Sequence, residues 1–232
     1  MTKMAIASKG ETTAETVKLS HKVSEILLKH RLWILTALAA CTILFAVIAT
    51  VSVVIGKSNE KAFEIIELRV SAWEEARIST DKAAITAAED TLIAELTPIA
   101  EKQMKRFAGI RAAMSLGEVY FAKKDWATAQ KWYVQAGQAD VQAYTSGIAF
   151  FNAAVCADEL NNADEAALYF KTASDTSSFS MKPRALFNLG RVEEQRMNTE
   201  AAAEAYKKLA ADYPEDQWTK LAKSRLVAME VK

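Results

Sequence analysis

Residues 110–136 carry the pattern that decides the fold: IRAAMSLGEVYFAKKDWATAQKWYVQA. Small residues at Gly117 and Ala129 let two helical backbones approach closely, and Tyr133 places a bulky side chain beside them. Asp125 stands between the two halves and is one of the residue types that most often cap the start of a helix. The stretch therefore predicts a hairpin of two helices, the second beginning after Asp125.

The same pattern returns twice along the chain at a nearly constant spacing. The small position is Gly117, Ala154 and Gly190, in steps of 37 and 36 residues, and the aromatic position is Tyr133, Phe170 and Tyr206, in the same steps. A capping residue, Asn162 or Asn198, also precedes each later second helix. Self-similarity at a period of about 20 to 50 residues indicates a repeat architecture, so we expect three helical hairpins over residues 107–215.

These units resemble tetratricopeptide repeats. In the first unit the resemblance rests on Leu116-Gly117, Tyr120, Ala129 and Ala136, and the spacing exceeds the usual period of about 34 residues by two or three. The resemblance implies an all-α fold in which hairpins stack into a superhelix. The aromatic position of each unit is then expected to fill the gap to the next hairpin.

Helices are also expected on both sides of the repeats. Residues 57–106 predict a helical linker and a degenerate hairpin, with a bend at Ser79–Asp81 and an interruption at Thr97-Pro98. Pro214 is expected to end the last repeat. Residues 216–232 predict a C-terminal amphipathic helix that caps the array with a polar outer face.

Residues 32–56 form an apolar stretch of 25 residues without one charged side chain. As a helix this stretch would be roughly 37 Å long, enough to cross a hydrocarbon core of about 30 Å. The apolar part of a cleaved signal peptide is shorter, so we predict a single transmembrane helix. Leu38–Cys41 also resembles a bacterial lipobox, which leaves lipidation of Cys41 open.

The charges that flank this stretch predict its orientation. Residues 1–31 carry six bases and three acids, whereas the part after residue 56 carries 23 bases and 26 acids. Positive flanks are retained on the cytoplasmic side of a membrane. We therefore expect a cytoplasmic basic tail over residues 1–31, a span in the bacterial inner membrane, and a periplasmic C-terminal part.

The part that follows the predicted span lacks the usual side chains of catalysis. His21 and His30 both precede the span, and the sequence has no Gly-rich phosphate loop. Cys156 lies in a helical pattern that favours a buried, inert thiol. We expect no enzymatic activity, catalytic residue, cofactor or metal ligand, and we expect protein partners rather than nucleic acid or a small-molecule substrate.

A basic tail, one span and degenerate repeats together resemble the YfgM-type ancillary subunit of the bacterial Sec translocon, and the likeness is strongest over Ala87–Val119. The resemblance implies association with the SecYEG channel and contacts with periplasmic chaperones or exported chains. It implies no catalytic residue. The alternative is a scaffold of another envelope assembly, such as a flagellar collar, a division complex or the outer-membrane biogenesis machinery.

In such a superhelix the first helix of each unit lines the concave face, chiefly through positions 2, 5, 9 and 12 of the unit. The expected peptide-binding groove comprises Arg111, Met114, Glu118, Phe121, Phe151, Asp158, Arg184, Phe187, Arg191 and Glu194. Apolar groups among charges suit a segment of another protein. The three arginines are the strongest candidates because an inner-face arginine has little packing reason to be there, whereas Phe151 and Phe187 could equally pack between hairpins.

Overall fold

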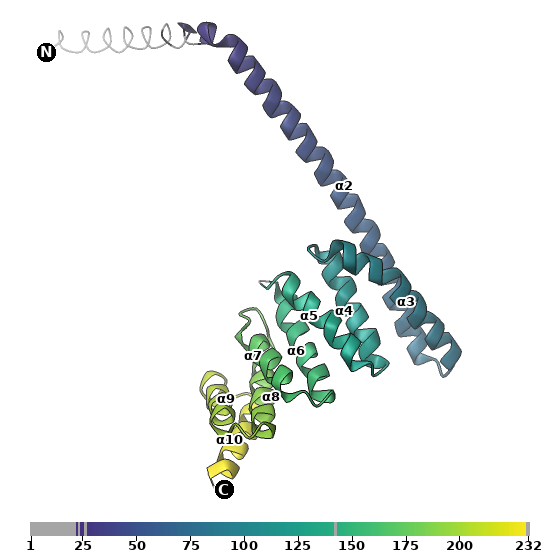
Figure 1. Ribbon diagram of the computed structural model, residues 1–232, viewed down its shortest axis with the longest axis vertical. Helices are drawn as coiled ribbons and strands as arrows, with labels where there is room; N and C mark the ends of the chain where they lie inside the picture. Colours follow the sequence, from purple (N-terminus) through teal and green to yellow (C-terminus); the bar gives the residue numbers. More distant parts are fainter. Residues whose placement is uncertain (1–21, 23, 26, 142, 231–232) are drawn as a thin grey trace, which may run out of the picture. The chain divides into compact units, whose positions relative to one another are not determined.

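The computed structural model describes residues 22, 24–25, 27–141 and 143–230 of the chain. The described helices are α2 (Arg31–Ile78), α3 (Lys82–Gln103), α4 (Phe107–Ala122), α5 (Trp126–Ala139), α6 (Tyr144–Glu159), α7 (Ala163–Asp175), α8 (Lys182–Gln195), α9 (Thr199–Asp212) and α10 (Gln217–Glu230) (Figure 1). No strand occurs in these residues, so the all-α prediction is confirmed. The chain divides into two compact units, Met1–Ser58 and Asn59–Lys232. Most of the predicted basic tail lies outside the described residues.

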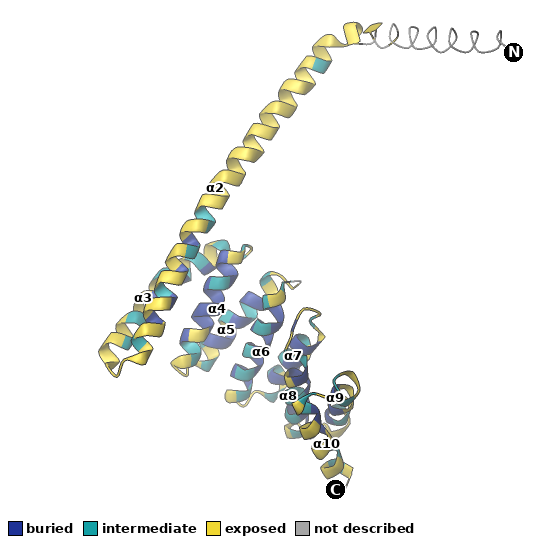
Figure 2. Ribbon diagram, turned by 180° about the vertical axis from the view of Figure 1, so that it is seen from behind, coloured by how far each residue is buried: buried dark blue, intermediate teal, exposed yellow. Residues whose placement is uncertain are grey.

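The first unit contains the apolar part of α2. Its side chains are exposed, as Figure 2 shows, with Leu44 60% and Phe45 76% accessible. By length and composition α2 is able to cross a membrane. Cys41 lies in this exposed part, and the helix continues without a break through Gly56 to Ile78.

The second unit begins within α2, where one side of the helix becomes buried. The buried positions are Ala62, Ile66, Val70 and Trp73, which recur every three or four residues and belong to one core cluster with residues of α3 to α6. The predicted bend at Ser79–Asp81 is confirmed, because α2 ends at Ile78 and α3 begins at Lys82. The Asp81 carboxylate caps α3 by accepting a hydrogen bond of 2.9 Å from the amide of Ala83.

The predicted interruption at Thr97-Pro98 is wrong, because α3 continues through Pro98 to Gln103. Proline lacks the amide that would donate to the carbonyl of Ala94. Ala94 and Pro98 are both exposed, so water can satisfy that carbonyl. The hydroxyl of Thr97 adds a 2.7 Å hydrogen bond to the carbonyl of Ile93, one turn back in the same helix.

Three hairpins follow, formed by α4 with α5, α6 with α7, and α8 with α9. Each helix packs on the next one along the chain, as Figure 1 shows. The three predicted caps are confirmed: Asp125 accepts from the amide of Thr128 at 3.1 Å, Asn162 from Glu165 at 3.3 Å, and Asn198 from Ala201 at 3.4 Å. Local capping therefore sets where each second helix starts.

The turn inside each hairpin has the same backbone form. The residue before the cap has a left-handed conformation, with φ of 61° at Lys124, 58° at Asn161 and 60° at Met197. Its amide donates to a carbonyl of the preceding turn, for example Lys124 to Phe121 at 3.0 Å. The repeat is thus conserved in backbone shape even where residue types differ.

The small and aromatic positions pack together as the spacing predicts. A Cβ atom added to Gly117 would lie 2.6 Å from the ring of Tyr133, and one added to Gly190 would lie 2.4 Å from the ring of Tyr206. Each ring therefore needs a glycine in its own hairpin. Tyr133 also forms a side-chain hydrogen bond with Asn152 in the next hairpin. The prediction that this aromatic residue fills the gap to the next hairpin is therefore confirmed for Tyr133.

The C-terminal helix α10 packs on α9 and α8. The second helix of the last repeat ends at Asp212, before Pro214, as predicted. Thr219 and Ala222 of α10 are buried. The prediction of a polar outer face is only partly right, because Leu221 is 49% and Val227 62% exposed.

Candidate functional site

The charged residues of the predicted groove join successive repeats. Arg191 of α8 forms an ion pair with Asp158 of α6. Glu194 of α8 accepts a 2.9 Å hydrogen bond from Nε of Arg225 in α10. Because the acid lies one repeat before its base in both cases, these pairs form a repeated link between first helices.

Arg111 has a comparable role at the other end of the array. Its Nε lies 3.2 Å from the Glu67 carboxylate of α2, and its Nη1 donates to the Ser115 hydroxyl at 2.7 Å. The reasoning that inner-face arginines lack a packing role is therefore wrong for Arg111 and Arg191. Their part in binding stays a prediction.

Several apolar groove candidates are core residues. Met114 is 8% and Phe151 3% exposed, so their expected place in an open groove is wrong. Phe151 is enclosed by the ring of Phe170 at 5.4 Å and that of Phe179 at 5.8 Å. Position 5 is therefore buried in the first two units. Phe121 is half-buried.

Arg184 is an accessible residue of the predicted groove. It is exposed, and its guanidinium lies 5.1 Å from the ring centre of Phe151 and 5.9 Å from that of Trp218. Phe187, half-buried, packs 5.2 Å from Trp218. A hollow of 310 Å³ adjoins this group, lined by Ser180, Met181, Pro183, Arg184, Asp216, Gln217 and Trp218. In the described residues Arg184 forms no ion pair, so its charge is held by aromatic rings alone.

Glu118 presents an exposed carboxylate on α4. Neighbouring protein atoms keep water from part of this carboxylate and so raise the pKa of Glu118, and the nearby charge of Glu74 acts in the same direction. Arg111 and Arg77 counter part of that effect. The carboxylate thus lies between charges of both signs contributed by α2 and α4.

Helix α10 supplies groove residues that the sequence reasoning missed. Arg225 follows its partner Glu194 by 31 residues, much as Arg191 follows Asp158 by 33. Trp218 likewise contributes to the hollow beside Arg184. The signal was present in this spacing, because α10 takes the place of the first helix of a further repeat. The row of first helices is therefore one helix longer than predicted.

The structure offers little that suggests catalysis. Within the described ranges no three His, Cys, Asp or Glu side chains gather in a way that could hold a metal ion. Burial raises the pKa of the Cys156 thiol to about 12, which leaves it protonated at neutral pH.

Residues 184–216, most of the third hairpin, match the tetratricopeptide repeat family model. The chain therefore contains a tetratricopeptide repeat at these residues. It is 37% identical over 150 residues to a TPR repeat-containing protein of Treponema pallidum (strain Nichols), a match that covers 64% of this chain and 63% of that protein. The chain thus aligns with less than two thirds of the relative's length.

A solved structure shows the same fold. It comes from Podosopora anserina and is described as a kinesin light chain with nearly identical TPR-like repeats. It superposes with a TM-score of 0.56 at 14% identity, over 71% of this chain and 85% of that chain. The chain therefore has a TPR-like repeat fold, and repeats of this kind typically serve as scaffolds for protein–protein interaction.

Proposed function

We propose that this protein is a membrane-anchored scaffold of the bacterial inner membrane. Its N-terminus lies in the cytoplasm and its tetratricopeptide repeats lie in the periplasm. The span associates with the SecYEG translocon, and the repeats bind exported chains or the chaperones that receive them.

The uncharged stretch at residues 32–56 carries this proposal. Its 25 residues are long enough to cross a bilayer, and the large apolar side chains among them are exposed. Burial in lipid removes that apolar surface from water. The excess of bases over acids before residue 32 favours a cytoplasmic N-terminus.

The hollow beside Arg184 supports the binding role. The Arg184 guanidinium is oriented by two rings and has no ion pair in the described residues, so it is well placed to donate hydrogen bonds to a carboxylate of a bound chain. Trp218 offers an apolar surface next to that charge. An acidic residue beside an apolar one in an exported segment would match both groups.

Crosslinking from the span tests the membrane part. A photoreactive amino acid at Leu44 or Val53 is expected to capture SecY, SecE or SecG in intact cells. Capture of motor, division or outer-membrane biogenesis proteins instead would support a different envelope scaffold. Protease protection in spheroplasts checks the orientation, since digestion of the repeats from outside is expected, and full protection would refute the proposal.

Substitution at the hollow tests the binding part. Arg184→Ala is expected to lower crosslinking of exported chains to the repeats at least about fivefold, because a charge-assisted hydrogen bond contributes roughly 1.5–3 kcal/mol. Lys207→Ala, an exposed change on α9, serves as the matched control and is expected to leave crosslinking unchanged. Equal yields from both variants would exclude Arg184 from the binding site.

A further inference from the structure

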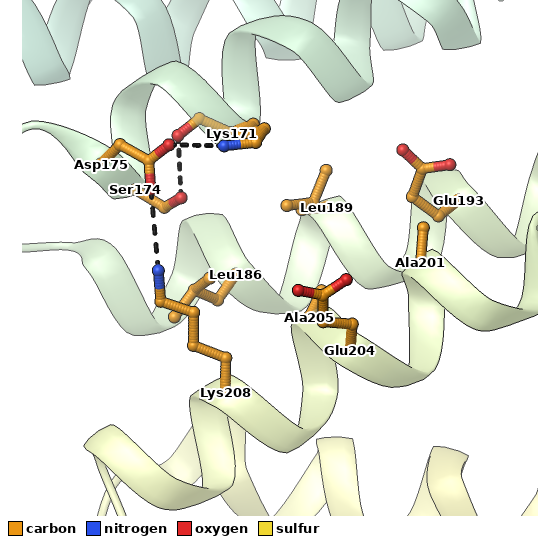
Figure 3. A pocket seen from close by; sticks show the side chains of 10 residues that line it. All are labelled: Lys171, Ser174, Asp175, Leu186, Leu189, Glu193, Ala201, Glu204, Ala205 and Lys208. Carbon is orange, nitrogen blue, oxygen red and sulfur yellow. Dashed lines mark hydrogen bonds and ion pairs between the residues drawn. The ribbon is translucent and has the colours of Figure 1, made fainter.

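A second hollow, of 220 Å³, opens between α7, α8 and α9 (Figure 3). Its apolar lining comes from Leu186 and Leu189 of α8 and from Ala201 and Ala205 of α9. None of its lining residues belongs to the predicted groove. It is therefore a separate feature of the repeat unit.

The same place in the preceding repeat is filled. Phe150 precedes Leu186 by 36 residues, and Tyr169 precedes Ala205 by 36. The rings of Phe150 and Tyr169 stack with their centres 6.1 Å apart. A Cβ atom on Gly137 would lie only 3.0 Å from Phe150, so that junction has no spare room.

A side-chain hydrogen bond also joins two helices at the corresponding place in the preceding repeat. Nε2 of Gln130 in α5 donates to the Glu165 carboxylate in α7 at 2.6 Å. The equivalent residues one repeat later are Ala167 and Ala201, at 37 and 36 residues further along. Smaller residues thus replace both the aromatic pair and the bridge. The hollow is a property of this junction and not of the repeat in general.

Charged side chains line the hollow, as Figure 3 shows: Lys171, Asp175 and Lys208 lie at one end, Glu193 at the other, and Glu204 between them. At one end Lys171 and Lys208 lie 2.7 Å and 3.7 Å from the single carboxylate of Asp175, which leaves a net positive charge. Glu204 is exposed and has no ion pair in the described part of the chain. Glu193 lies 2.9 Å from Arg196, whose guanidinium also lies 2.8 Å from Asp164.

The volume of this hollow suits a single aromatic side chain. A cavity of about 150 Å³ is enough to hold benzene. Sites for drug-sized molecules usually measure about 300–1,000 Å³, so a hollow of 220 Å³ is small for them. One aromatic side chain fits, as the filled junction of the preceding repeat illustrates.

We propose that this hollow docks an aromatic side chain of a partner polypeptide. The partner segment carries an acidic residue that faces Lys171 and Lys208, and a basic residue that faces Glu204. The partner's ring takes the place that Tyr169 fills in the preceding repeat. This contact depends neither on the first-helix face nor on the proposed association with SecYEG.

Labelled peptides test the proposal on the full-length protein in lipid nanodiscs. Two twelve-residue peptides each carry a central Phe, with Asp three residues before it and Lys three residues after it, or the reverse order. Fluorescence anisotropy is expected to show that one order binds more tightly than the other. Replacing its Phe by Ala is expected to weaken binding at least about tenfold, because the buried ring contributes most of the apolar contact.

Filling the hollow is the decisive variant. Ala205→Tyr installs the residue of the preceding repeat and is expected to weaken peptide binding at least about tenfold while the melting temperature stays or rises. Lys207→Tyr adds the same side chain to α9 outside the hollow and is expected to leave binding within about twofold. The double change Lys208→Glu and Glu204→Lys is expected to reverse the preferred peptide order.

Three results would overturn the proposal: neither peptide binds, Ala205→Tyr binds as well as the wild type, or the hollow proves to join two copies of this chain. Sedimentation of the wild type and Ala205→Tyr detects the last case as a loss of dimer. Arg184→Ala is expected to leave peptide binding at this hollow unchanged. Failure of the groove proposal and failure of this one are therefore distinguishable.

Discussion

The change Gly190→Ala tests the packing that joins the two helices of the third repeat. An added Cβ would lie 2.4 Å from Cε1 of Tyr206 and 2.7 Å from its Cδ1 and Cζ. Carbon atoms normally approach to about 3.5–4.0 Å, so the ring or α8 must shift by roughly 1 Å. The ring of Tyr206 has no exposed surface. Its hydroxyl donates to Glu194 at 2.7 Å, which further restricts its movement.

The expected loss of stability is worked out from two opposing effects. Overpacking of a core usually costs about 1–3 kcal/mol, and a contact this short belongs at the upper end. Alanine in a helix interior is favoured over glycine by about 1 kcal/mol. The free energy of unfolding is therefore expected to fall by about 2 kcal/mol, which lowers the melting temperature by roughly 4–8 °C in a unit of this size.

Thermal unfolding of the full-length protein, followed by circular dichroism, measures this change. Gly56→Ala is the control, since nothing lies within 4 Å of an added Cβ there. At the positions of Gly190 and Tyr206 the second repeat has Ala154 and Phe170, the same pair of residue types that the double variant below creates. The added change Tyr206→Phe frees the ring from Glu194 and is expected to recover part of the loss. A Gly190→Ala variant as stable as the wild type, or a double variant whose effects simply add, would refute the reasoning.

Three further predictions concern a thiol, a carboxylate and an ion pair. Because burial raises the pKa of Cys156 to about 12, its native thiol is expected to react with a thiol reagent at pH 8 only after unfolding, measured in a Cys41→Ala background. The pKa of Glu118 is raised in the folded protein, so the stability that its protonated form contributes at low pH is lost as the pH rises through that folded pKa. Glutamine carries no such charge, so Glu118→Gln is expected to be more stable than the wild type at pH 7. The difference in melting temperature is expected to vanish near pH 4, where the glutamate is protonated too. The Asp158–Arg191 pair is about one-third exposed, so a double-mutant cycle with Ala at both positions is expected to give a coupling of about 1 kcal/mol or less, and a value above about 2 kcal/mol would show that the pair is a main support of the array.

The hairpins could be predicted because their signals are local or periodic. Asp125, Asn162 and Asn198 each cap a helix through bonds to residues three positions ahead. The pairing of Gly117 with Tyr133 follows from a spacing that recurs in every unit. Pro98 misled the prediction because its effect depends on whether water can reach the freed carbonyl, which is a tertiary property.

The groove could be predicted only in outline. Repeat positions identify which helix faces are alike, but they do not say how far a side chain is buried or what it meets. Met114 and Phe151 turned out to be core residues, and Arg191 turned out to bind Asp158 one repeat earlier. Arg184 is the exception, because aromatic rings orient it while its charge stays exposed.

An all-helical chain of stacked hairpins preceded by an apolar segment follows from composition, period and capping, since each of these acts over a few residues or repeats at a constant interval. Tertiary structure alone decided which charges pair between repeats and which junction stays hollow. Those outcomes depend on side chains some 30 or more residues apart, such as Lys171 and Lys208 around one carboxylate, whose meeting is set by how closely the helices pack.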